Sequence, residues 1–303
     1  MPDILPTPAD VCAVMVTFLP DEGFPARLEK VTSQFSQTIV VDNSPSDGVP
    51  KELSIRTALP RIHVVSNATN IGVAAALNQG IEKASQLGFR WVITLDQDTE
   101  VEPRMPETLL EEYRLLPAGD ALLGANYWDV HKGQMAVPCY GSKRDPKERK
   151  TVITSGCLIP ISLFRDIGSF REDYFIDSVD HEFCLRARAH GYRVFITCRP
   201  LMRQSVGAAH GRVGRICRLL GRRHSAPRKY FMARNSLATV KTYLFREPTW
   251  GLCQVARLVA EVAFLLSCER ERSKQLRAFA VGVLHGVKGR LGPIEETWPS
   301  GAS

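Results

Sequence analysis

The sequence predicts an α/β protein with a mostly parallel sheet, followed by a helical region at the carboxyl end. Short apolar runs rich in β-branched residues alternate with segments of helical spacing through residue 98. Two of these runs end in aspartate. Beyond residue 199 the apolar residues follow helical spacing and basic residues dominate. Strands and helices that alternate with short links favour a parallel sheet with right-handed crossovers.

The individual elements follow from their apolar runs and their boundary residues. We expect strands at 11–17, 38–41, 62–66, 91–95, 121–125 and 151–160, the last with a break at Ser155–Gly156, helices at 24–35, 71–87 and 103–116, and a short helical turn at 163–167. The polar stretch 140–150 is expected to be an exposed loop. Its Lys, Arg and Asp residues have no place in a buried sheet.

Composition and charge describe an ordinary globular chain with an asymmetric surface. The 303 residues are 44% hydrophobic and 23% charged, enough for one large domain with an appendage or for two domains. Residues 1–198 hold 20 Lys and Arg against 26 Asp and Glu, whereas residues 199–303 hold 19 against 6. Between residues 199 and 235 no acid occurs. This basic half predicts an anionic partner such as a diphosphate, lipid headgroups or nucleic acid.

The amino terminus and the cysteines favour a reducing cytoplasm. Residues 1–4 show no basic region followed by an apolar run, so no secretory signal is expected. The eight cysteines are scattered and form no C-x-x-C pair. Neither a zinc cluster nor a disulfide framework is therefore predicted.

Two carboxylates follow the apolar run 91–95. Asp96 and Asp98 are separated by one residue, so both can turn their oxygens toward one point at the edge of the sheet. Open α/β sheets bind their ligands at this edge, and oxygen ligands of this kind suit Mg²⁺ or Mn²⁺ shared with substrate phosphates. The alternative is a strand followed by an ordinary Asp-rich turn.

A second strand also ends in an acid, Asp42, which could hold a base or a ribose hydroxyl. An Asx turn before Pro45 explains it equally well. Small residues at the start of the helix 71–87, beginning with Gly72, allow close approach of a phosphate. This is not the G-x-G-x-x-G pattern, so no nicotinamide or flavin cofactor is expected.

A further acidic cluster lies at residues 177–182. Asp177 or Ser178 would cap a helix that runs to residue 190. Carboxylates are common in a first helical turn, and Glu182 with Arg186 has the spacing of a surface ion pair. The apolar residues 174–176 before Asp180 favour a functional carboxylate instead, because a capping residue does not need them.

The basic half contains helical patterns at 227–245, 250–267 and 275–287. Arg257 and Glu261 interrupt the most apolar of these, which we therefore expect to be too broken to span a bilayer. It either packs in a helical subdomain or lies in the headgroup plane of an anionic membrane.

Together these motifs resemble the rhamnosyltransferase branch of glycosyltransferase family 2. The likeness covers about the first two hundred residues in unbroken order and extends to residue 235. The matching segments are 16–18, 41–44, 70–80, 95–98, 175–186, 228–231 and 234–235. Each motif is weak alone, but their order is specific.

The resemblance implies a GT-A fold with a Rossmann-like, mixed sheet and an inverting transfer from a nucleotide sugar. Asp98 would be the main contact of a Mg²⁺ or Mn²⁺ ion, with Asp96 close by, and Asp180 matches the general base. One departure is Gln204, where the family often has a histidine that helps to hold the metal or the diphosphate. His210 is near it in sequence. Contacts with the nucleotide sugar would come from Thr17, Asp42, Asn70, Gly72, Asn78, Asp96 and Gln97.

Inversion requires a hydroxyl to attack the anomeric carbon opposite the leaving diphosphate. A carboxylate must accept the hydroxyl proton, and Asp180 is the candidate. A cation on Asp96 and Asp98 would stabilise the diphosphate charge. Arg228 and Arg234 are cationic candidates for the same charge, with solvated helix positions as the alternative.

We therefore expect a GT-A catalytic domain at 1–210 and a basic helical extension at 211–303. The predicted donor is dTDP-L-rhamnose, and the acceptor is a surface glycan or a lipid-linked saccharide. The protein would be cytoplasmic and peripheral on the inner face of the cell membrane. Alternatives are a UDP-sugar-dependent family 2 transferase that moves galactofuranosyl or hexosyl groups, a nucleotidyltransferase, or a non-catalytic membrane- or nucleic-acid-binding protein. A nucleotidyltransferase would need a Gly-rich basic loop where residues 18–22 are acidic, and nucleic acid is not the expected partner.

Overall fold

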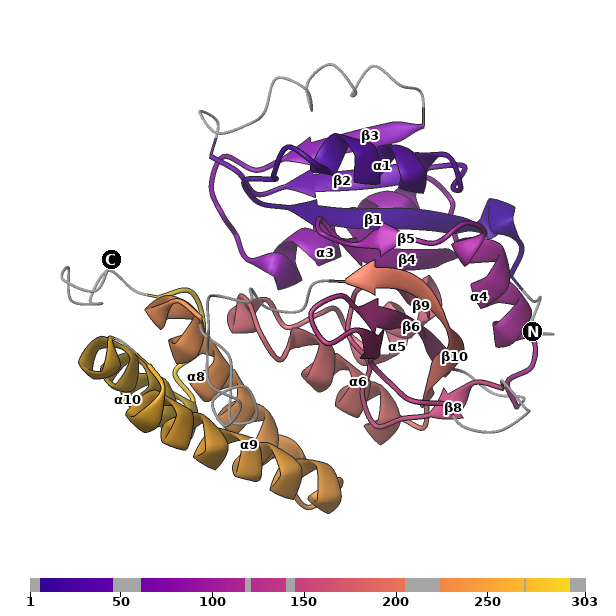
Figure 1. Ribbon diagram of the computed structural model, residues 1–303. Helices are drawn as coiled ribbons and strands as arrows, with labels where there is room; N and C mark the ends of the chain where they lie inside the picture. The colour runs from indigo at the N-terminus through magenta and orange to yellow at the C-terminus, as the bar shows by residue number, and fades with distance from the viewer. Residues whose placement is uncertain are drawn as a thin grey trace. The chain divides into compact units, whose positions relative to one another are not determined.

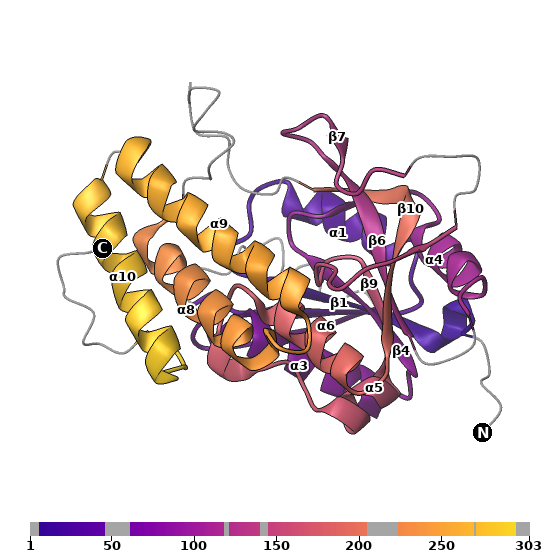
Figure 2. The same ribbon diagram turned by 90° about the horizontal axis from the view of Figure 1, so that it is seen from below.

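The computed structural model describes residues 6–45, 61–117, 121–139, 145–204, 224–269 and 271–294. The chain forms two compact units, each described by itself below. The first comprises Met1–Phe170 and Arg186–Ser205, and the second comprises Arg171–Leu185 and Val206–Ser303. Figures 1 and 2 show the helices and strands of both units.

The first unit is built on one large sheet, whose first half is parallel. Its strands follow the order β3, β2, β1, β4. Every residue of β1 and β2 is buried, as continuous apolar runs predict for strands covered on both faces. The four strands confirm the predicted ones to within one residue: β1 Val11–Thr17, β2 Thr38–Asp42, β3 Ile62–Ser66 and β4 Trp91–Asp96.

The second half of the sheet is mixed. From β4 it continues in the order β9, β6, β10, β5. Strand β9 is antiparallel to both neighbours, and β10 is parallel to β6. The strands are β5 Glu100–Val101, β6 Ala121–Asp129, β7 Gln134–Met135, β8 Lys147–Glu148, β9 Cys157–Pro160 and β10 Arg193–Gln204. The predicted mixed, mostly parallel sheet is confirmed.

Helices cover the sheet of this unit (Figure 2). One core cluster joins Phe24 and Leu28 of α1 and Leu109 of α4 to sheet residues such as Met15 and Ile93. Helix α3 packs on β1 and β2. The helices are η1 Pro8–Asp10, α1 Phe24–Thr32, α3 Val73–Gln86, α4 Met105–Tyr113, α5 Ile161–Ile167 and α6 Val179–Ala189, the last of which crosses from the second unit into the first.

Two predicted segments differ from the structure. The strand expected at 151–160 begins only at Cys157, after the predicted break, where Gly156 has a left-handed φ of 73°. Of the loop expected at 140–150, residues 140–144 lie outside the described residues, and Lys147–Glu148 forms β8. Strand β10 was not expected, because Pro200 and several arginines interrupt its apolar pattern, and its register shifts on both sides of Pro200.

The expectation that no disulfide forms is wrong. Cys139 and Cys198 are disulfide-bonded, with their Cα atoms 5.6 Å apart. Strands β6 and β10 pair along their length, and residue 139 follows the β6–β7 hairpin, so tertiary pairing joins cysteines 59 residues apart. The argument for a reducing compartment from cysteine spacing therefore no longer applies.

A buried carboxylate on α4 makes the stability of the first unit sensitive to pH. Glu112 is 3% exposed, and its Oε1 lies 3.6 Å from Nε of Arg199. Neither carboxylate oxygen has a hydrogen-bond partner among the described residues. Burial raises the pKa of Glu112 to about 7, and Arg199 opposes this only in part. The folded protein therefore favours the neutral acid.

Glu112→Gln is expected to flatten the pH dependence of stability. Because the folded pKa lies above the unfolded one, the contribution of the neutral acid is complete below about pH 4.5 and is lost as pH rises through 7. A shift of this size corresponds to about 3 kcal/mol at most. The measurement is urea unfolding between pH 5 and 8, with Glu22→Gln, which removes an exposed carboxylate of the same unit, as control. An equal slope in wild type and Glu112→Gln would contradict this account.

In its described residues, the second unit contains three long helices and the segment Arg171–Leu185. These helices confirm the predicted patterns: α8 Ala226–Tyr243, α9 Pro248–Ser267 and α10 Arg272–Lys288. The backbones of α8 and α10 approach closely, since a Cβ at Gly286 would lie 2.7 Å from the carbonyl oxygen of Arg234. Buried Lys229 of α8 pairs with Glu261 of α9. That pair satisfies a carboxylate which, in sequence, appeared to interrupt an apolar helix.

The unit boundary differs from the domain boundary expected at residue 210. Residues 205–223 lie outside the described residues, but Arg171–Leu185 belongs to the second unit rather than to the first. This segment adds the 3₁₀ helix η2, Glu172–Tyr174, to the second unit. Its packing explains the assignment, because Leu185 shares a core cluster with Val240, Tyr243 and Trp250.

Helix α9 begins at Pro248, two residues before the predicted start, and ends at Ser267 as predicted. By length and composition alone it could cross a membrane, the single such helix in the described part of the chain. This corrects the expectation that Arg257 and Glu261 break it too strongly.

Candidate functional site

Three predicted site residues end neighbouring parallel strands. In the sheet register, Thr17 of β1 lies opposite Asp42 of β2, and Asp96 of β4 lies opposite Val16 of β1. The carboxyl ends of β1, β2 and β4 therefore share one edge of the sheet (Figure 1). This is the edge at which open α/β sheets bind ligands.

Asp42 is a buried carboxylate whose two oxygens differ in their hydrogen bonding. Its Oδ1 accepts hydrogen bonds from Thr17 Oγ1 at 2.8 Å, from Ser44 Oγ at 2.7 Å and from the Ser44 amide at 3.1 Å. The residue is 0% exposed, and Oδ2 has no hydrogen-bond partner in the described residues. Buried polar atoms are almost always paired. Oδ2 could therefore accept a hydrogen bond from a ligand, such as one from a nucleobase N–H or a ribose hydroxyl.

Asn70 and Gly72 shape the start of α3. The Asn70 side-chain oxygen accepts the Gly72 amide at 2.9 Å, and Asn43 Nδ2 donates to the Gly72 carbonyl oxygen at 3.1 Å. Gly72 has φ 88°, a backbone conformation that residues other than glycine rarely adopt. Helix α3 thus begins at the same sheet edge, and its amino terminus favours negative charge.

The turn at Asp96–Asp98 is anchored to the loop after β1. Gln97 Oε1 accepts the Phe18 amide at 2.7 Å, and the Gln97 carbonyl oxygen accepts Nε of Arg27 at 2.7 Å. The Gln97 side chain therefore holds the turn in place through its oxygen. Its predicted contact with the nucleotide stays a prediction that these contacts do not support.

The acidic turn fits a divalent cation shared with a ligand. Gln204 Nε2 donates to Asp96 Oδ2 at 3.0 Å, and Gln204 Oε1 is buried without a hydrogen-bond partner within the described ranges. Asp98 is exposed. No group of three or more His, Cys, Asp or Glu side chains in these ranges could hold a metal alone. Two carboxylates and an amide oxygen suit Mg²⁺ or Mn²⁺ only if diphosphate oxygens complete the shell. His210 lies outside the described residues.

Asp180 belongs to the second unit, at the start of α6. It is the second residue of that helix and is half-buried, and its Oδ1 accepts the His181 amide at 2.8 Å. Asp177 lies just before the helix with a left-handed φ of 64°, so it does not cap it as expected. Burial raises the pKa of Asp177, and the half-exposed Arg228, 3.3 Å away, opposes this. The Arg228 side chain is half-exposed, so its guanidinium is accessible to a ligand.

Two predicted binding residues have other roles in the structure. Arg234 is 1% exposed, and its guanidinium donates to backbone carbonyl oxygens of Asp173 and Tyr174. This corrects its expected role at the diphosphate, because a buried guanidinium with occupied donors has none left for a ligand. Asn78 pairs with the Phe170 backbone in both directions, at 2.9 and 3.0 Å. Its amide is therefore occupied as well.

The sequence did not single out Arg27 or Ser44 as site residues. Ser44 had a signal, since a serine two residues after a strand-ending aspartate commonly bonds to it. Arg27 had none, because its contact with Gln97 joins residues 70 positions apart.

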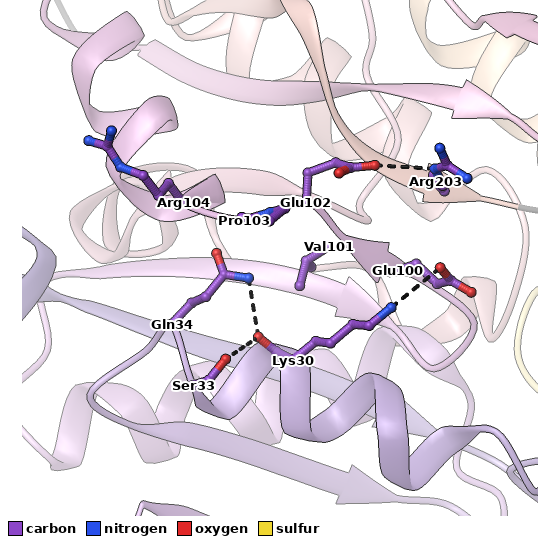
Figure 3. A pocket seen from close by; sticks show the side chains of 9 residues that line it. All are labelled: Lys30, Ser33, Gln34, Glu100, Val101, Glu102, Pro103, Arg104 and Arg203. Atoms are coloured by element: carbon purple, nitrogen blue, oxygen red, sulfur yellow. Dashed lines mark hydrogen bonds and ion pairs between the residues drawn. The ribbon is translucent and has the colours of Figure 1, made fainter.

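One cavity of about 460 Å³ is lined by residues of α1, β5 and β10 and by the start of α4 (Figure 3). Lys30 pairs with Glu100 at 3.7 Å and Arg203 with Glu102 at 3.2 Å across its wall. None of the predicted site residues lines it. Its lining residues Glu100 and Arg203 are close in sequence to Asp98 and Gln204.

Comparisons with known proteins agree with this geometry. Residues 12–158 match the family model of glycosyl transferase family 2. The chain is 22% identical over 301 residues to a dTDP-rhamnosyl transferase, RfbF, of Shigella flexneri, covering 94% of this chain and 97% of the relative.

Two solved structures show the same fold. The structure of TarS residues 1–349 from S. aureus matches with TM-score 0.57 and 13% identity, over 92% of this chain and 81% of that one. GalNAc-T7, solved with UDP, GalNAc and Mn²⁺, matches with TM-score 0.56 and 13% identity, over 79% of this chain. The chain spans about half of the GalNAc-T7 chain, 48%. With its GT-A-like sheet and its match over residues 12–158, the chain is similar to glycosyl transferase family 2.

Proposed function

We propose that the protein is an inverting glycosyltransferase that moves L-rhamnose from dTDP-L-rhamnose to a hydroxyl of a surface-polysaccharide or lipid-linked acceptor. One observation carries the nucleotide part: the buried carboxylate of Asp42 keeps an open oxygen beside Thr17, at the sheet edge where α3 begins. The named function of the Shigella relative supports the choice of donor. A UDP-sugar donor is the alternative.

Each part of the donor has a candidate partner. Asp42 Oδ2 would accept a hydrogen bond from the base or the ribose, and the amino terminus of α3 at Gly72 would face the diphosphate. Asp96, Asp98 and Gln204 Oε1 would hold Mg²⁺ or Mn²⁺, which neutralises charge on the leaving diphosphate when bound. Gln204 also holds one Asp96 oxygen through its amide, so the cation would depend more on Asp98.

Asp180 would act as the general base. As the acceptor oxygen forms its bond to the anomeric carbon, the bond from that carbon to the diphosphate oxygen breaks, and the hydroxyl proton passes to the Asp180 carboxylate. This requires the carboxylate to reach the acceptor hydroxyl in the complex with both substrates. Arg228, half-exposed in the same unit, is the remaining cationic candidate for the departing diphosphate.

A panel of dTDP-, UDP- and GDP-sugars, with and without Mg²⁺ or Mn²⁺, tests donor and metal together. We expect dTDP-L-rhamnose to bind tightest by calorimetry and to be the one slowly hydrolysed. Asp42→Ala should weaken dTDP binding by about 10- to 100-fold, the range for a lost hydrogen bond to a charged group. Tighter binding of a UDP-sugar would select the alternative donor. Absence of binding to all of them would favour a non-catalytic protein.

We further propose that α9 docks on the surface of an anionic membrane. Its outward face carries exposed apolar residues at helical spacing: Leu252, Val255, Val259 and Leu266. In residues 224–294, nine Lys or Arg are not buried, against only Glu247 and Glu271 among the described acids. The nine are Arg228, Lys241, Arg246, Arg257, Arg272, Lys274, Arg277, Lys288 and Arg290. A second copy would carry the same charge and be repelled, whereas anionic headgroups attract it.

Leu252→Glu is expected to reduce sedimentation with phosphatidylglycerol-containing vesicles by about tenfold or more. The substitution removes the favourable free energy of burying a Leu side chain in the membrane, about 1.5–3 kcal/mol. The wild-type chain should not sediment with pure phosphatidylcholine. Leu115→Glu is a matched control in the first unit, since both leucines are 64% exposed. Equal loss in both variants, or a mass that doubles with concentration and is halved by Leu252→Glu, would refute membrane docking.

A further inference from the structure

The backbone just before α6 adopts unfavourable conformations. Phe175, Asp177 and Ser178 have φ values of 63°, 64° and 60°. Left-handed conformations are costly for residues other than glycine, by roughly 1 kcal/mol or more each. Three of them within four residues persist only where surrounding contacts hold the chain. Such strain often accompanies a functional constraint.

Asn235 of α8 supplies much of that restraint. Its Nδ2 lies 2.8 Å from the carbonyl oxygen of Tyr174, 2.7 Å from that of Ile176 and 3.0 Å from that of Asp177. The side chain is fully buried. The Asn235 amide nitrogen therefore lies within hydrogen-bond distance of three backbone carbonyl oxygens of the strained segment.

Arg234 fixes the orientation of that amide. Its Nε donates to Asn235 Oδ1 at 2.8 Å, so the Asn235 NH₂ group must face the carbonyls. Its Nη2 lies 3.0 Å from the Asp173 carbonyl oxygen and 3.2 Å from that of Tyr174. The rings of Tyr230 and Phe231 lie 5.3 and 4.8 Å from its guanidinium carbon, so the group is held in place.

Further residues of α8 extend the restraint to the start of α6. The Tyr174 hydroxyl bonds to Thr239 Oγ1 at 2.9 Å, and Ser178 Oγ lies 3.3 Å from Ser236 Oγ. Asp180 follows Ser178 by two residues. The position of its carboxylate is therefore set by a backbone that α8 holds at residues 173, 174, 176, 177 and 178.

We propose that Arg234 and Asn235 are positioning residues for Asp180, so that helix α8 holds the segment that carries the proposed base. This inference rests on the role proposed above for Asp180. Removing the Asn235 amide would release three carbonyls and let the strained segment relax. The Asp180 carboxylate would then move away from the position in which it meets the acceptor hydroxyl.

Asn235→Ala in the full chain is expected to lower kcat about 100-fold while the KM for the donor changes less than twofold. Apart from Arg228, the residues proposed to bind the donor belong to the first unit, whereas Asn235 belongs to the second. Phe279→Leu is the matched control, because it loosens a core cluster of the same helical unit without contacting the strained segment. It should lower the melting temperature and leave kcat unchanged. Should Asn235→Ala fail to fold by circular dichroism, Arg234→Lys, which keeps the charge but loses the planar fork, should show the same split.

The double variant Asp180→Asn/Asn235→Ala separates positioning from an independent effect. If Asn235 acts through Asp180, the double variant is no slower than Asp180→Asn alone. Multiplying losses, or an unchanged kcat in Asn235→Ala and Arg234→Lys, would overturn the inference. Full activity of Asp180→Asn would instead refute the proposed base, so the two failures are distinguishable.

Discussion

Asp180→Asn is expected to lower kcat about 1,000-fold, with donor binding unchanged. Asparagine has the size of aspartate and keeps an oxygen for the His181 amide, so the first turn of α6 should form as before. It cannot accept the proton of the acceptor hydroxyl, and general bases contribute roughly 100- to 10,000-fold. The measurement is steady-state transfer to an acceptor hydroxyl, together with calorimetry of dTDP binding.

Glu271→Gln is the control for that change, because it removes an exposed carboxylate from the same unit. It should retain wild-type kcat and KM. If Asp180→Asn keeps activity within tenfold of wild type while folding normally, another group accepts the proton. The assignment of the base would then be lost, but the nucleotide site would not be affected.

Asp98→Ala is expected to abolish the gain in dTDP affinity that Mg²⁺ or Mn²⁺ provides, and to lower kcat/KM by about 100-fold or more. The expectation follows from Gln204, whose amide engages one oxygen of Asp96 and leaves more of the cation's binding to Asp98. Calorimetry of dTDP with Mn²⁺ and with EDTA measures the effect without catalysis. Binding of dTDP in EDTA should equal that of wild type.

Glu111→Ala, which removes an exposed carboxylate of the first unit, serves as the matched control and should behave like wild type. Should the wild-type chain bind dTDP equally in Mn²⁺ and in EDTA, the metal assignment fails outright. A metal effect that survives in Asp98→Ala but disappears in Asp96→Ala would instead transfer the main contact to Asp96.

The parallel half of the fold could be predicted because its strands are continuous apolar runs. Runs such as 11–17 and 38–41 are buried on both faces, and their ends are marked by polar residues. Strand β10 could not be predicted in this way, since Pro200 and exposed arginines disturb its pattern. Only its pairing with β6 makes the segment a strand.

The candidate site was predicted in part for the same reason. Asp42 and Asp96 end parallel strands, so sequence and topology bring them to one edge. The role of Arg234 was predicted wrongly, because the sequence of a basic helix does not show which of its basic side chains is buried. Its partners are carbonyl groups some 60 residues away, and backbone groups carry no sequence signature.

By itself the sequence determined the alternation of strands and helices, the acids that end two strands, and the basic character of the second half. The tertiary structure decided which oxygen of Asp42 stays open, that Gln204 meets Asp96, that Cys139 meets Cys198, and that α8 holds the segment before Asp180. Periodicity and composition report how one element divides its faces between core and solvent. Contacts between residues 59 to 108 positions apart depend on which faces meet, and that is a property of the packed chain.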